Sequence, residues 1–384
     1  MRVAFVTVCL SPHQLPLADA IVARVGADNF RYISNEDVGL DRGKLGWESE
    51  GRPWCRSRAD TGSLAEIDEW CRNADVLFCY LREPDVFEDR VRRGRLTIYV
   101  SERWFKPIAI RGFELSGLLV PGWVRMLNPR YFRMALCFRR LLGDKTRFLY
   151  FPMGVHAARD MARLRSWGHP VFSPQVPCAA FRKMRLWGYF VTPSRHPLPS
   201  SMDRSAELSV LWVGRLLQLK RVDTIIQAVC SHAKRRLRNR LLPALTLDIY
   251  GIGPDERRLK EFASGCDMVH FHAPVPIVDV RALMRNHDVY VFSSTGLDGW
   301  GAVVSEALEE GMHVLGTYEA GSSATMLTDR DLFHAGDWRR LQMLLERCLD
   351  EKRCGTLRGQ GIGEWSAEKA ADRLLALIID EMRK

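Results

Sequence analysis

The sequence predicts an α/β protein with two doubly wound, Rossmann-like domains. At 384 residues the chain is longer than one hydrophobic core usually supports. Apolar runs of strand length alternate with helical stretches, an order that favours parallel sheets. The alternation is lost between residues 172 and 205, and dense proline there indicates a connection between domains. The prolines are Pro174, Pro177, Pro193, Pro197 and Pro199.

These elements set the expected boundaries. We predict an amino-terminal domain over residues 1–190, a linker over 191–208, a carboxy-terminal domain over 209–365 and an amphipathic final helix over 366–384 that can pack on either domain. Apolar runs rich in β-branched and aromatic residues predict strands at 2–8, 75–80, 96–101, 148–151, 210–213, 245–250, 269–272, 288–293 and 312–316. Helices are predicted, among others, at 16–25, 85–93 and 129–142.

Composition excludes several classes of protein. Hydrophobic residues make up 47% and charged residues 27% of the chain, as in ordinary folded proteins. The ten cysteines include no C-x-x-C pair, so neither a disulfide framework nor a thiolate zinc site is expected. The apolar start of the chain gives way to polar residues at Ser11 and is too short for a signal peptide or a membrane span. We therefore expect a cytoplasmic protein.

The net charge of +10 is concentrated in one stretch. Residues 101–200 carry 17 basic and 4 acidic side chains, while the remainder of the chain is close to neutral. A field of this sign attracts an anionic partner, such as a membrane surface, a phosphorylated lipid or a nucleic acid. Because no recognisable nucleic-acid-binding module accompanies the charge, we expect no nucleic-acid partner.

The first candidate site follows the strand at 210–213. In VLWVGRLLQLKR the strand ends at Gly214, and Arg215 and Lys220 project from the turn and the start of the next helix. Two cations beside unpaired backbone N–H groups form a site for a diphosphate. The alternative is a solvated basic helix start.

The second candidate site, STGLDGWGAVVSEALEEG, follows the apolar strand DVYVFSS and so lies where open α/β sheets bind ligands. Gly299 and Gly301 allow the backbone to approach a phosphate closely, and the helix that opens near Val303 offers its N–H groups to the same anion. Asp298 and Glu306 can hold hydroxyls at the two ends of a ligand whose phosphates lie between them. The alternative is a turn-forming Asp298 and a Glu306 paired with a neighbouring arginine.

Together the two motifs resemble the carboxy-terminal half of the retaining GT-B glycosyltransferases of glycosyltransferase family four. The pattern of that family is Gly-Arg with a Lys five residues after the Arg, and then a Glu, seven residues and a second Glu. It falls here on Gly214, Arg215, Lys220, Asp298 and Glu306. The intervening segments LDIYGIGPDERRLKEFA and VHFHAPVP are also similar to the family, and the resemblance is good over residues 209–326.

The resemblance implies two Rossmann-like domains facing a cleft and transfer of a sugar from a nucleotide sugar, with retention of anomeric configuration. By that resemblance Arg215 and Lys220 bind the donor diphosphate. Glu306 then binds the ribose and Asp298 the sugar. The complete donor-binding set is Gly214, Arg215, Lys220, Gly251, Pro274, Asp298, Gly299, Gly301, Ala302, Val303 and Glu306, with Gly251 and Pro274 near the nucleoside.

Asp298 departs from the family pattern, which usually has Glu at this position. Its carboxylate is one methylene shorter, so it reaches a different sugar hydroxyl or none. We expect an active enzyme with an unusual donor preference. Two alternatives stay open, a sugar-nucleotide epimerase of the same architecture and a donor-binding partner subunit without catalysis.

The amino-terminal half offers candidates for acceptor binding. His13 lies in SPHQLP after the first strand, and Glu102 and Arg103 follow the strand at 96–101. In similar enzymes this loop contributes a polar residue near the reacting carbon, so Glu102 is a candidate to orient the acceptor or to stabilise an oxocarbenium-like transition state. The alternatives are an ordinary surface histidine and a surface ion pair of Glu102 with Arg103 or Lys106.

The segment GWVRMLNPRYFRMALCFRR interleaves cations with apolar side chains and contains no acidic residue. On a helix this pattern suits a segment that lies in a membrane interface. We expect Arg130, Arg133, Arg139 and Arg140 to contact the inner face of an anionic membrane. The alternative is a core helix with a solvated basic face.

The expected reaction needs no cofactor and no metal, because Arg215, Lys220 and the amides near Val303 stabilise charge on the departing diphosphate. The expected acceptor is a glycan or a lipid-linked molecule in surface polysaccharide synthesis. Whether the donor is a UDP-sugar or a GDP-sugar stays open.

Two patterns that resemble metal sites are set aside. Asp329 and Asp331 have D-x-D spacing but lie past the last donor strand, in an expected loop. His270 and His272 share one face of a strand, but no third ligand is near.

Overall fold

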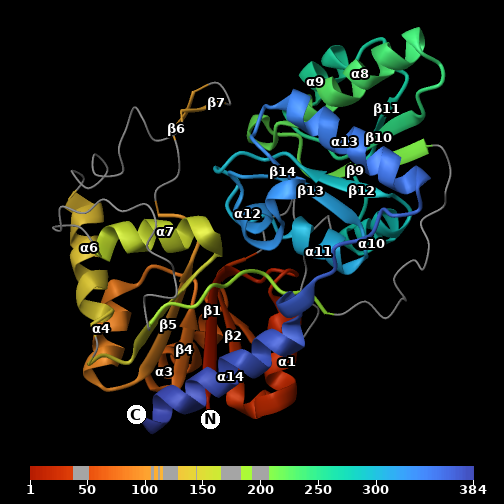
Figure 1. Ribbon diagram of the computed structural model, residues 1–384. Helices are drawn as coiled ribbons and strands as arrows, with labels where there is room; N and C mark the ends of the chain where they lie inside the picture. Colours follow the sequence, from red (N-terminus) through yellow and green to blue (C-terminus); the bar gives the residue numbers. More distant parts are fainter. Residues whose placement is uncertain are drawn as a thin grey trace. The chain divides into compact units, whose positions relative to one another are not determined.

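The computed structural model describes residues 1–37, 52–104, 108–110, 113–115, 129–143, 145–165, 183–192 and 207–384. The chain divides into two compact units (Figure 1). The first unit comprises Met1–Lys106, Gly117–Thr192 and Glu364–Lys384, and the second comprises Pro107–Ser116 and Pro193–Gly363.

The first unit is built on a six-stranded parallel sheet in the order β3-β2-β1-β4-β5-β8. Its strands are β1 (Val3–Cys9), β2 (Phe30–Glu36), β3 (Cys55–Ser57), β4 (Val76–Cys79), β5 (Leu96–Ser101) and β8 (Phe148–Pro152). Its α-helices are α1 (Leu15–Val25), α3 (Leu64–Asn73), α4 (Pro84–Arg92), α6 (Pro129–Leu141), α7 (Gly154–Arg165) and α14 (Ala367–Arg383). Short 3-10 helices lie at η1 (Ala27–Asn29) and η2 (Thr61–Ser63).

The second unit contains another six-stranded parallel sheet, in the order β11-β10-β9-β12-β13-β14. Its strands are β9 (Glu207–Val213), β10 (Ala244–Tyr250), β11 (Val269–His272), β12 (Val289–Phe292), β13 (His313–Thr317) and β14 (Leu332–Phe333). Its α-helices are α8 (Val222–Arg238), α9 (Glu256–Phe262), α10 (Ile277–Arg285), α11 (Val303–Glu309), α12 (Gly321–Met326) and α13 (Trp338–Arg353). The 3-10 helices η4 (Gln218–Lys220), η5 (Asp329–Asp331) and η6 (Gly363–Trp365) and the antiparallel hairpin β6 (Ile108–Ile110) and β7 (Phe113–Leu115) complete the described elements.

Both sheets have the same topology. Numbered along the chain within each sheet, the strands lie in the order 3-2-1-4-5-6, which is the doubly wound order of dinucleotide-binding folds. The order reverses between β1 and β4 in the first sheet and between β9 and β12 in the second. Ligands of such sheets bind beyond the carboxyl ends of the strands at this reversal, so the loops after β9 and β12 are the first place to search for a site.

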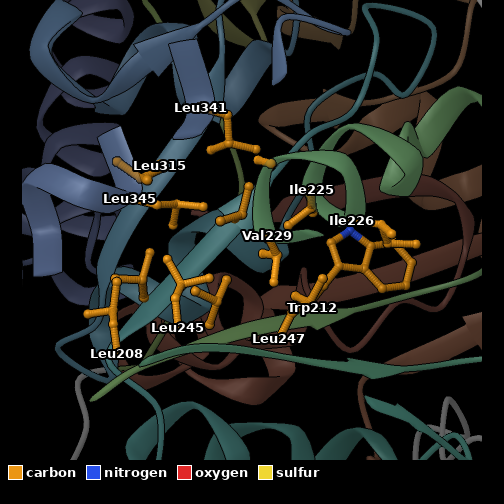
Figure 2. Packing of buried hydrophobic residues seen from close by; sticks show 14 of the residues in the cluster. Leu208, Trp212, Ile225, Ile226, Val229, Leu245, Leu247, Leu315, Leu341 and Leu345 are labelled. Atoms are coloured by element: carbon orange, nitrogen blue, oxygen red, sulfur yellow. The ribbon is translucent and has the colours of Figure 1, made fainter. Parts of the chain in front are cut away.

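Apolar side chains cover both faces of the second sheet. One cluster joins β9 and β10 to α8 and α13, and Figure 2 shows Trp212, Ile226 and Leu345 within it. A second cluster joins β12 and β13 to α10 and α11, with Tyr290 and Val304 fully buried. Burial on both faces explains why β12, VYVF, is a continuous apolar run rather than an alternating one.

The last helix, α14, packs against α1 in the first unit. Leu374 and Ile378 on its inner face are buried, and Asp372 accepts a hydrogen bond from Arg24 Nε at 2.6 Å. The side chain of Ser366 caps the helix by accepting from the backbone N–H of Lys369. The chain therefore returns to the first unit after it has completed the second.

The predicted fold class is confirmed, with parallel sheets in both units. The structure adds elements that periodicity did not reveal. Met184 and Trp187, in the proline-rich stretch expected to connect the domains, form parallel bridges to Tyr150 and Met153 beside β8. Strand β9 begins at Glu207, inside the expected linker. No helix within the described ranges has a stretch long and apolar enough to cross a lipid bilayer.

Candidate functional site

The loops that follow β9 and β12 are joined at the reversal point of the second sheet. Ser293 Oγ donates to the carbonyl oxygen of Lys220 at 2.6 Å, and Thr295 N donates to the carbonyl oxygen of Leu219 at 2.9 Å. These bonds bring the two sequence motifs, which are about 80 residues apart, to one edge of the sheet.

Lys220 and Asp298, predicted as separate donor ligands, contact each other. Lys220 Nζ donates to the two carboxylate oxygens of Asp298 at 2.7 and 2.6 Å. The two side chains are 20% and 13% exposed, so the pair is shielded but open to a ligand. The ammonium group also lies 5.9 Å from the ring centroid of Phe292. A diphosphate that binds Lys220 must therefore share it with Asp298 or displace that carboxylate.

Arg215 presents a different environment. Its side chain is exposed and forms no hydrogen bond or ion pair with any other residue that the structure describes. It directly follows Gly214, whose N–H donates to the carbonyl oxygen of Tyr250 at 3.1 Å. The guanidinium is therefore available to an anion at the carboxyl end of β9.

Gly251 lies against the turn after β9 more closely than any side chain allows. A Cβ atom at Gly251 would be 1.9 Å from the carbonyl oxygen of Gly214, and one at Gly253 would be 2.2 Å from that of Leu216. Leu216 N donates to the carbonyl oxygen of Ile252 at 2.9 Å. The loop after β10 is thus fixed directly beside the Gly214–Arg215 turn, because glycine permits the approach.

Gly301 has a comparable steric requirement in the second motif. Its φ is 84°, and a Cβ there would meet the ring of Phe292 at 2.2 Å. The neighbouring Gly299 has a φ of 78°, and its carbonyl oxygen accepts from Gly321 N at 3.1 Å. Helix α11 then begins at Val303. In its first turn, Val304 N and Ser305 N donate to the carbonyl oxygens of Gly301 and Ala302 at 3.3 and 3.0 Å.

The charges of Asp298 and Glu306 act on Tyr290, a residue that sequence reasoning did not select. Tyr290 is fully buried and donates to the carbonyl oxygen of Val213 at 3.3 Å. Burial raises the pKa of Tyr290, and the charges of Glu306 and Asp298 raise it further. The tyrosine thus joins β12 to the last residue of β9. An aromatic hydroxyl inside an apolar strand was the available signal, because such groups need a partner.

The ring of Tyr250, at the end of β10, is stacked on His272 with centroids 4.3 Å apart and planes 13° apart. His272 Nε2 lies 2.6 Å from Asp248 Oδ1, while His270 is exposed. Pro274 is also exposed, two residues past the strand. Over the described ranges no group of three or more His, Cys, Asp or Glu side chains is arranged to hold a metal ion.

The Asp329–Asp331 pattern forms η5 rather than an open loop. Asp331 Oδ1 accepts from Arg347 at 2.6 Å and lies 3.2 Å from His313 Nε2. Its carboxylate therefore has a structural role between β13, η5 and α13.

In the first unit, His13 and Glu102 both lie near Tyr189. The rings of His13 and Tyr189 have centroids 6.1 Å apart. Burial raises the pKa of Tyr189 well above its usual value, and the charge of Glu102 adds to that effect. Arg103 Nε lies 3.6 Å from the buried carboxylate of Asp160. Tyr189 and Asp160 were not predicted, since one is in the proline-rich stretch and the other within α7.

The basic segment predicted to contact a membrane is partly described. Residues 122–128 and the side chains of Arg130 and Arg139 lie outside the described part. On α6, Arg133 and Arg140 are exposed, and Arg140 is paired with Glu88. Phe132 and Leu136 on the same helix are 36% and 46% exposed.

Comparison with known proteins identifies the second unit. The family model described as "Glycosyl transferases group 1" matches residues 202–358, which confirms the resemblance for the segment that holds both motifs. The GtfA subunit of a UDP-N-acetylglucosamine–peptide N-acetylglucosaminyltransferase from Streptococcus agalactiae is 28% identical over 108 residues, 28% of this chain and 20% of that protein. The corresponding subunit from Streptococcus parasanguinis is 30% identical over 108 residues, with the same coverage. The match thus spans about a fifth of these relatives.

Solved structures resemble nearly the whole chain. Anabaena HepE in complex with UDP and glucose has a TM-score of 0.60 at 13% identity, covering 99% of this chain and 100% of that one. WaaG, a glycosyltransferase involved in lipopolysaccharide biosynthesis, has a TM-score of 0.53 at 17% identity, covering 97% and 99%. At these identities the comparison establishes the fold, which is GT-B.

Proposed function

We propose that this chain, a GT-B protein whose residues 202–358 form a glycosyl transferases group 1 domain, transfers a sugar from a nucleotide sugar to a glycan or lipid-linked acceptor with retention of configuration. The proposal is supported by the Lys220–Asp298 ion pair, which joins the loops after β9 and β12. Arg215 follows β9 and Glu306 lies in α11, the helix after β12. In a pathway, the product would serve surface polysaccharide synthesis.

The donor diphosphate would bind between Arg215 and Lys220. Both are cations at the carboxyl end of one sheet, and Arg215 is exposed with no partner in the described part of the chain. Fixed positive charge at this point stabilises the oxyanion that forms as the bond to the sugar breaks. Because two side chains and the amides after Gly301 supply that charge, the proposal includes no metal ion.

The remaining donor groups would bind around this diphosphate. Glu306 would accept hydrogen bonds from the ribose hydroxyls and Asp298 from a sugar hydroxyl, while Gly251 and Pro274 would lie near the nucleoside. The relatives named for UDP-N-acetylglucosamine and the neighbour solved with UDP and glucose favour UDP-sugars as the first donors to test.

The acceptor would bind to the first unit near His13, Glu102 and Arg103, with Glu102 positioned to orient it or to stabilise positive charge on the sugar. The proximity of His13 and Glu102 to Tyr189 supports this placement. Contact of α6 with the inner face of an anionic membrane through Arg133 and Arg140 would bring a lipid-linked acceptor to the enzyme.

A thermal-shift screen of UDP-sugars and GDP-sugars tests the donor site. A ligand present at 100 times its dissociation constant adds about 2.7 kcal/mol of stability, and we expect one class of nucleotide sugar to do so. Arg215→Ala removes an exposed side chain and should abolish that shift without unfolding the protein. Arg339→Ala, which removes an exposed arginine from α13 of the same unit, is the matched control and should keep it.

Product analysis then separates the candidate activities. Formation of free nucleotide and glycosylated acceptor, at a rate that a metal chelator does not change, supports metal-independent transfer. An isomerised donor would indicate an epimerase. Binding without turnover would indicate a donor-binding subunit. Glu102→Gln should slow transfer but leave donor binding unchanged, and unimpaired transfer in that variant would remove Glu102 from the proposal.

A further inference from the structure

The carboxy-terminal end of α8 forms a basic surface that the proposed function does not use. Five cations occur between residues 234 and 240, and no acidic residue occurs between residues 224 and 247. We call this region, with the two leucines within and beside it, the α8 surface. Its residues are Lys234, Arg235, Arg236, Leu237, Arg238, Arg240 and Leu241.

Most of the charge on the α8 surface is not neutralised within the fold. Arg235 pairs with Glu346, and Arg236 Nε donates to the carbonyl oxygen of Leu242 at 3.1 Å. Lys234, Arg238 and Arg240 are exposed and form no hydrogen bond or ion pair with another residue in the described part of the chain. Cations near the carboxyl end of a helix are stabilised by the helix dipole. Arg240 lies beyond the last residue of α8, so this stabilisation does not explain its presence.

The same surface exposes large apolar side chains. Leu241 is 91% and Leu237 is 79% exposed, the two highest values among the large hydrophobic residues that the structure describes. Single exposed leucines are common, whereas two leucines interleaved with unpaired cations form the pattern of a segment that enters a lipid interface.

A hollow of about 550 Å³ adjoins these residues between α8 and the loop after α9. Helices α8 and α9 contact each other and lie side by side in Figure 1. Leu237, Phe262 and Met268 give the hollow an apolar lining, while cations from α8 also line it and Asp267 contributes one carboxylate. Phe262 is 47% exposed. The apolar area therefore continues from the leucines into a recess with positive charge around it.

We propose that the α8 surface docks onto an anionic lipid bilayer, with Leu237 and Leu241 entering the headgroup region and Lys234, Arg238 and Arg240 contacting lipid phosphates. Anionic lipid satisfies both features of the surface, since it offers negative charge and an apolar layer beneath it. A nucleic acid would use the cations but leave the leucines in water. This contact lies in the second unit and is distinct from the one proposed for α6.

Co-sedimentation of the full-length protein with vesicles tests the proposal. We expect binding to phosphatidylcholine vesicles that contain 30% phosphatidylglycerol and much weaker binding to phosphatidylcholine alone. Changing Lys234, Arg238 and Arg240 together to Gln should lower the partition coefficient about a hundredfold, given the usual contribution of each cation. Changing Leu237 and Leu241 together to Ser should lower it at least tenfold at unchanged charge.

Matched variants make each comparison specific. The charge control changes three exposed arginines together to Gln, which removes the same charge elsewhere on the protein. These residues are Arg339, Arg353 and Arg383. Val278→Ser with Met343→Ser removes two apolar side chains that are 77% and 60% exposed. Both controls should bind anionic vesicles like the parent.

Several outcomes would overturn the docking surface. Equal losses in the controls would show an unspecific charge or apolar effect. Unchanged vesicle binding by both α8 variants, with loss in Arg133→Glu and Arg140→Glu, would assign all membrane contact to α6. Nucleic-acid binding that is lost in the cation variant but kept in the leucine variant would assign the surface to a nucleic acid. A concentration-dependent dimer that is lost in the leucine variant would assign it to a second copy of the chain. None of these results bears on donor turnover, which is measured separately.

Discussion

Lys220 and Asp298 form an ion pair, and this pairing bears on what the aspartate does. An ammonium group within 2.7 Å of both carboxylate oxygens is held at the edge of the sheet but is less attractive to a second anion. If the diphosphate binds as proposed, Asp298 would therefore modulate how strongly Lys220 holds it.

Asp298→Asn is therefore predicted to strengthen binding of UDP while it weakens sugar transfer. Removing the negative charge leaves Lys220 to the diphosphate, and we expect UDP affinity to rise by roughly threefold to tenfold, about 1 kcal/mol. Isothermal titration with UDP and with uridine measures the effect, and uridine affinity should not change.

Asp279→Asn, in the first turn of α10 and exposed, is the control for that titration. If Asp298→Asn binds UDP no better than this control, Asp298 does not compete for Lys220. A loss of UDP affinity would mean instead that the aspartate is needed to hold the lysine in place.

At the scale of elements, Arg90 joins α3, α4 and β5 inside the first unit. The side chain is fully buried, and its guanidinium donates to four backbone carbonyl oxygens and to Thr97 Oγ1 at 2.9–3.1 Å. Burial lowers the pKa of Arg90 to about 10, so the group remains charged near neutral pH.

Arg90→Lys is predicted to destabilise the first unit by about 3–5 kcal/mol. An ammonium group has three donors and cannot reproduce the planar fork of five, so buried carbonyl groups lose their partners. Denaturant unfolding combined with hydrogen exchange in α3 and α4 measures the change. Arg92→Lys, on the exposed side of α4, is the control, and equal stability of the two variants would contradict the assignment.

A second buried network joins β13, η5 and α13 through His313, Asp331 and Arg347. Burial opposes protonation of His313, but hydrogen bonds with Asp331 and Cys348 outweigh it and raise the pKa of His313 to about 10. Because the folded pKa exceeds the unfolded value of about 6.5, the resulting stability is fully present below pH 6.5. It is lost as the pH rises through about 10.

We therefore expect the free energy of unfolding of the second unit to fall by about 1–3 kcal/mol between pH 6.5 and 10 because of His313. Urea unfolding at several pH values measures this slope. His313→Gln should have a flatter profile over the same range, and a profile parallel to that of the parent would exclude the histidine as its source.

At the scale of the whole molecule, the two units have separate cores, and the chain closes the first only with α14. Leu374→Ala, at a buried position of α14, which packs against α1, should cost the first unit about 2–5 kcal/mol. Ile379→Ala, at a position 45% exposed, should cost little.

Calorimetry with and without UDP distinguishes the units in that experiment. We expect Leu374→Ala to lower the transition of the first unit only, and UDP to raise the transition of the second unit in parent and variant alike. A UDP effect lost in Leu374→Ala would show that donor binding depends on the contact between α14 and α1.

Much of this architecture was predictable because it depends on local periodicity. The strand at 96–101 has the bounds that its apolar run indicated, since parallel strands buried on both faces are continuous apolar segments. The strand at 269–272 also has the predicted bounds. Strand β3, three half-buried residues, has no such signal and was missed.

The site was predictable in its motifs but not in its contacts. Spacing located Lys220 and Asp298 after their strands, but their mutual pairing depends on how β9 and β12 neighbour each other in the sheet. Tyr189 and Arg90 acquire their roles only through tertiary contacts, and nothing in the adjacent sequence distinguishes them.

The loops after β9 and β10 touch along their main chains, at Gly214 with Gly251 and at Leu216 with Gly253. A side chain at Gly251 or Gly253 would require the facing backbone to move. Over evolutionary time, we expect these two loops to change in side chains that lie away from this contact, while insertions accumulate elsewhere.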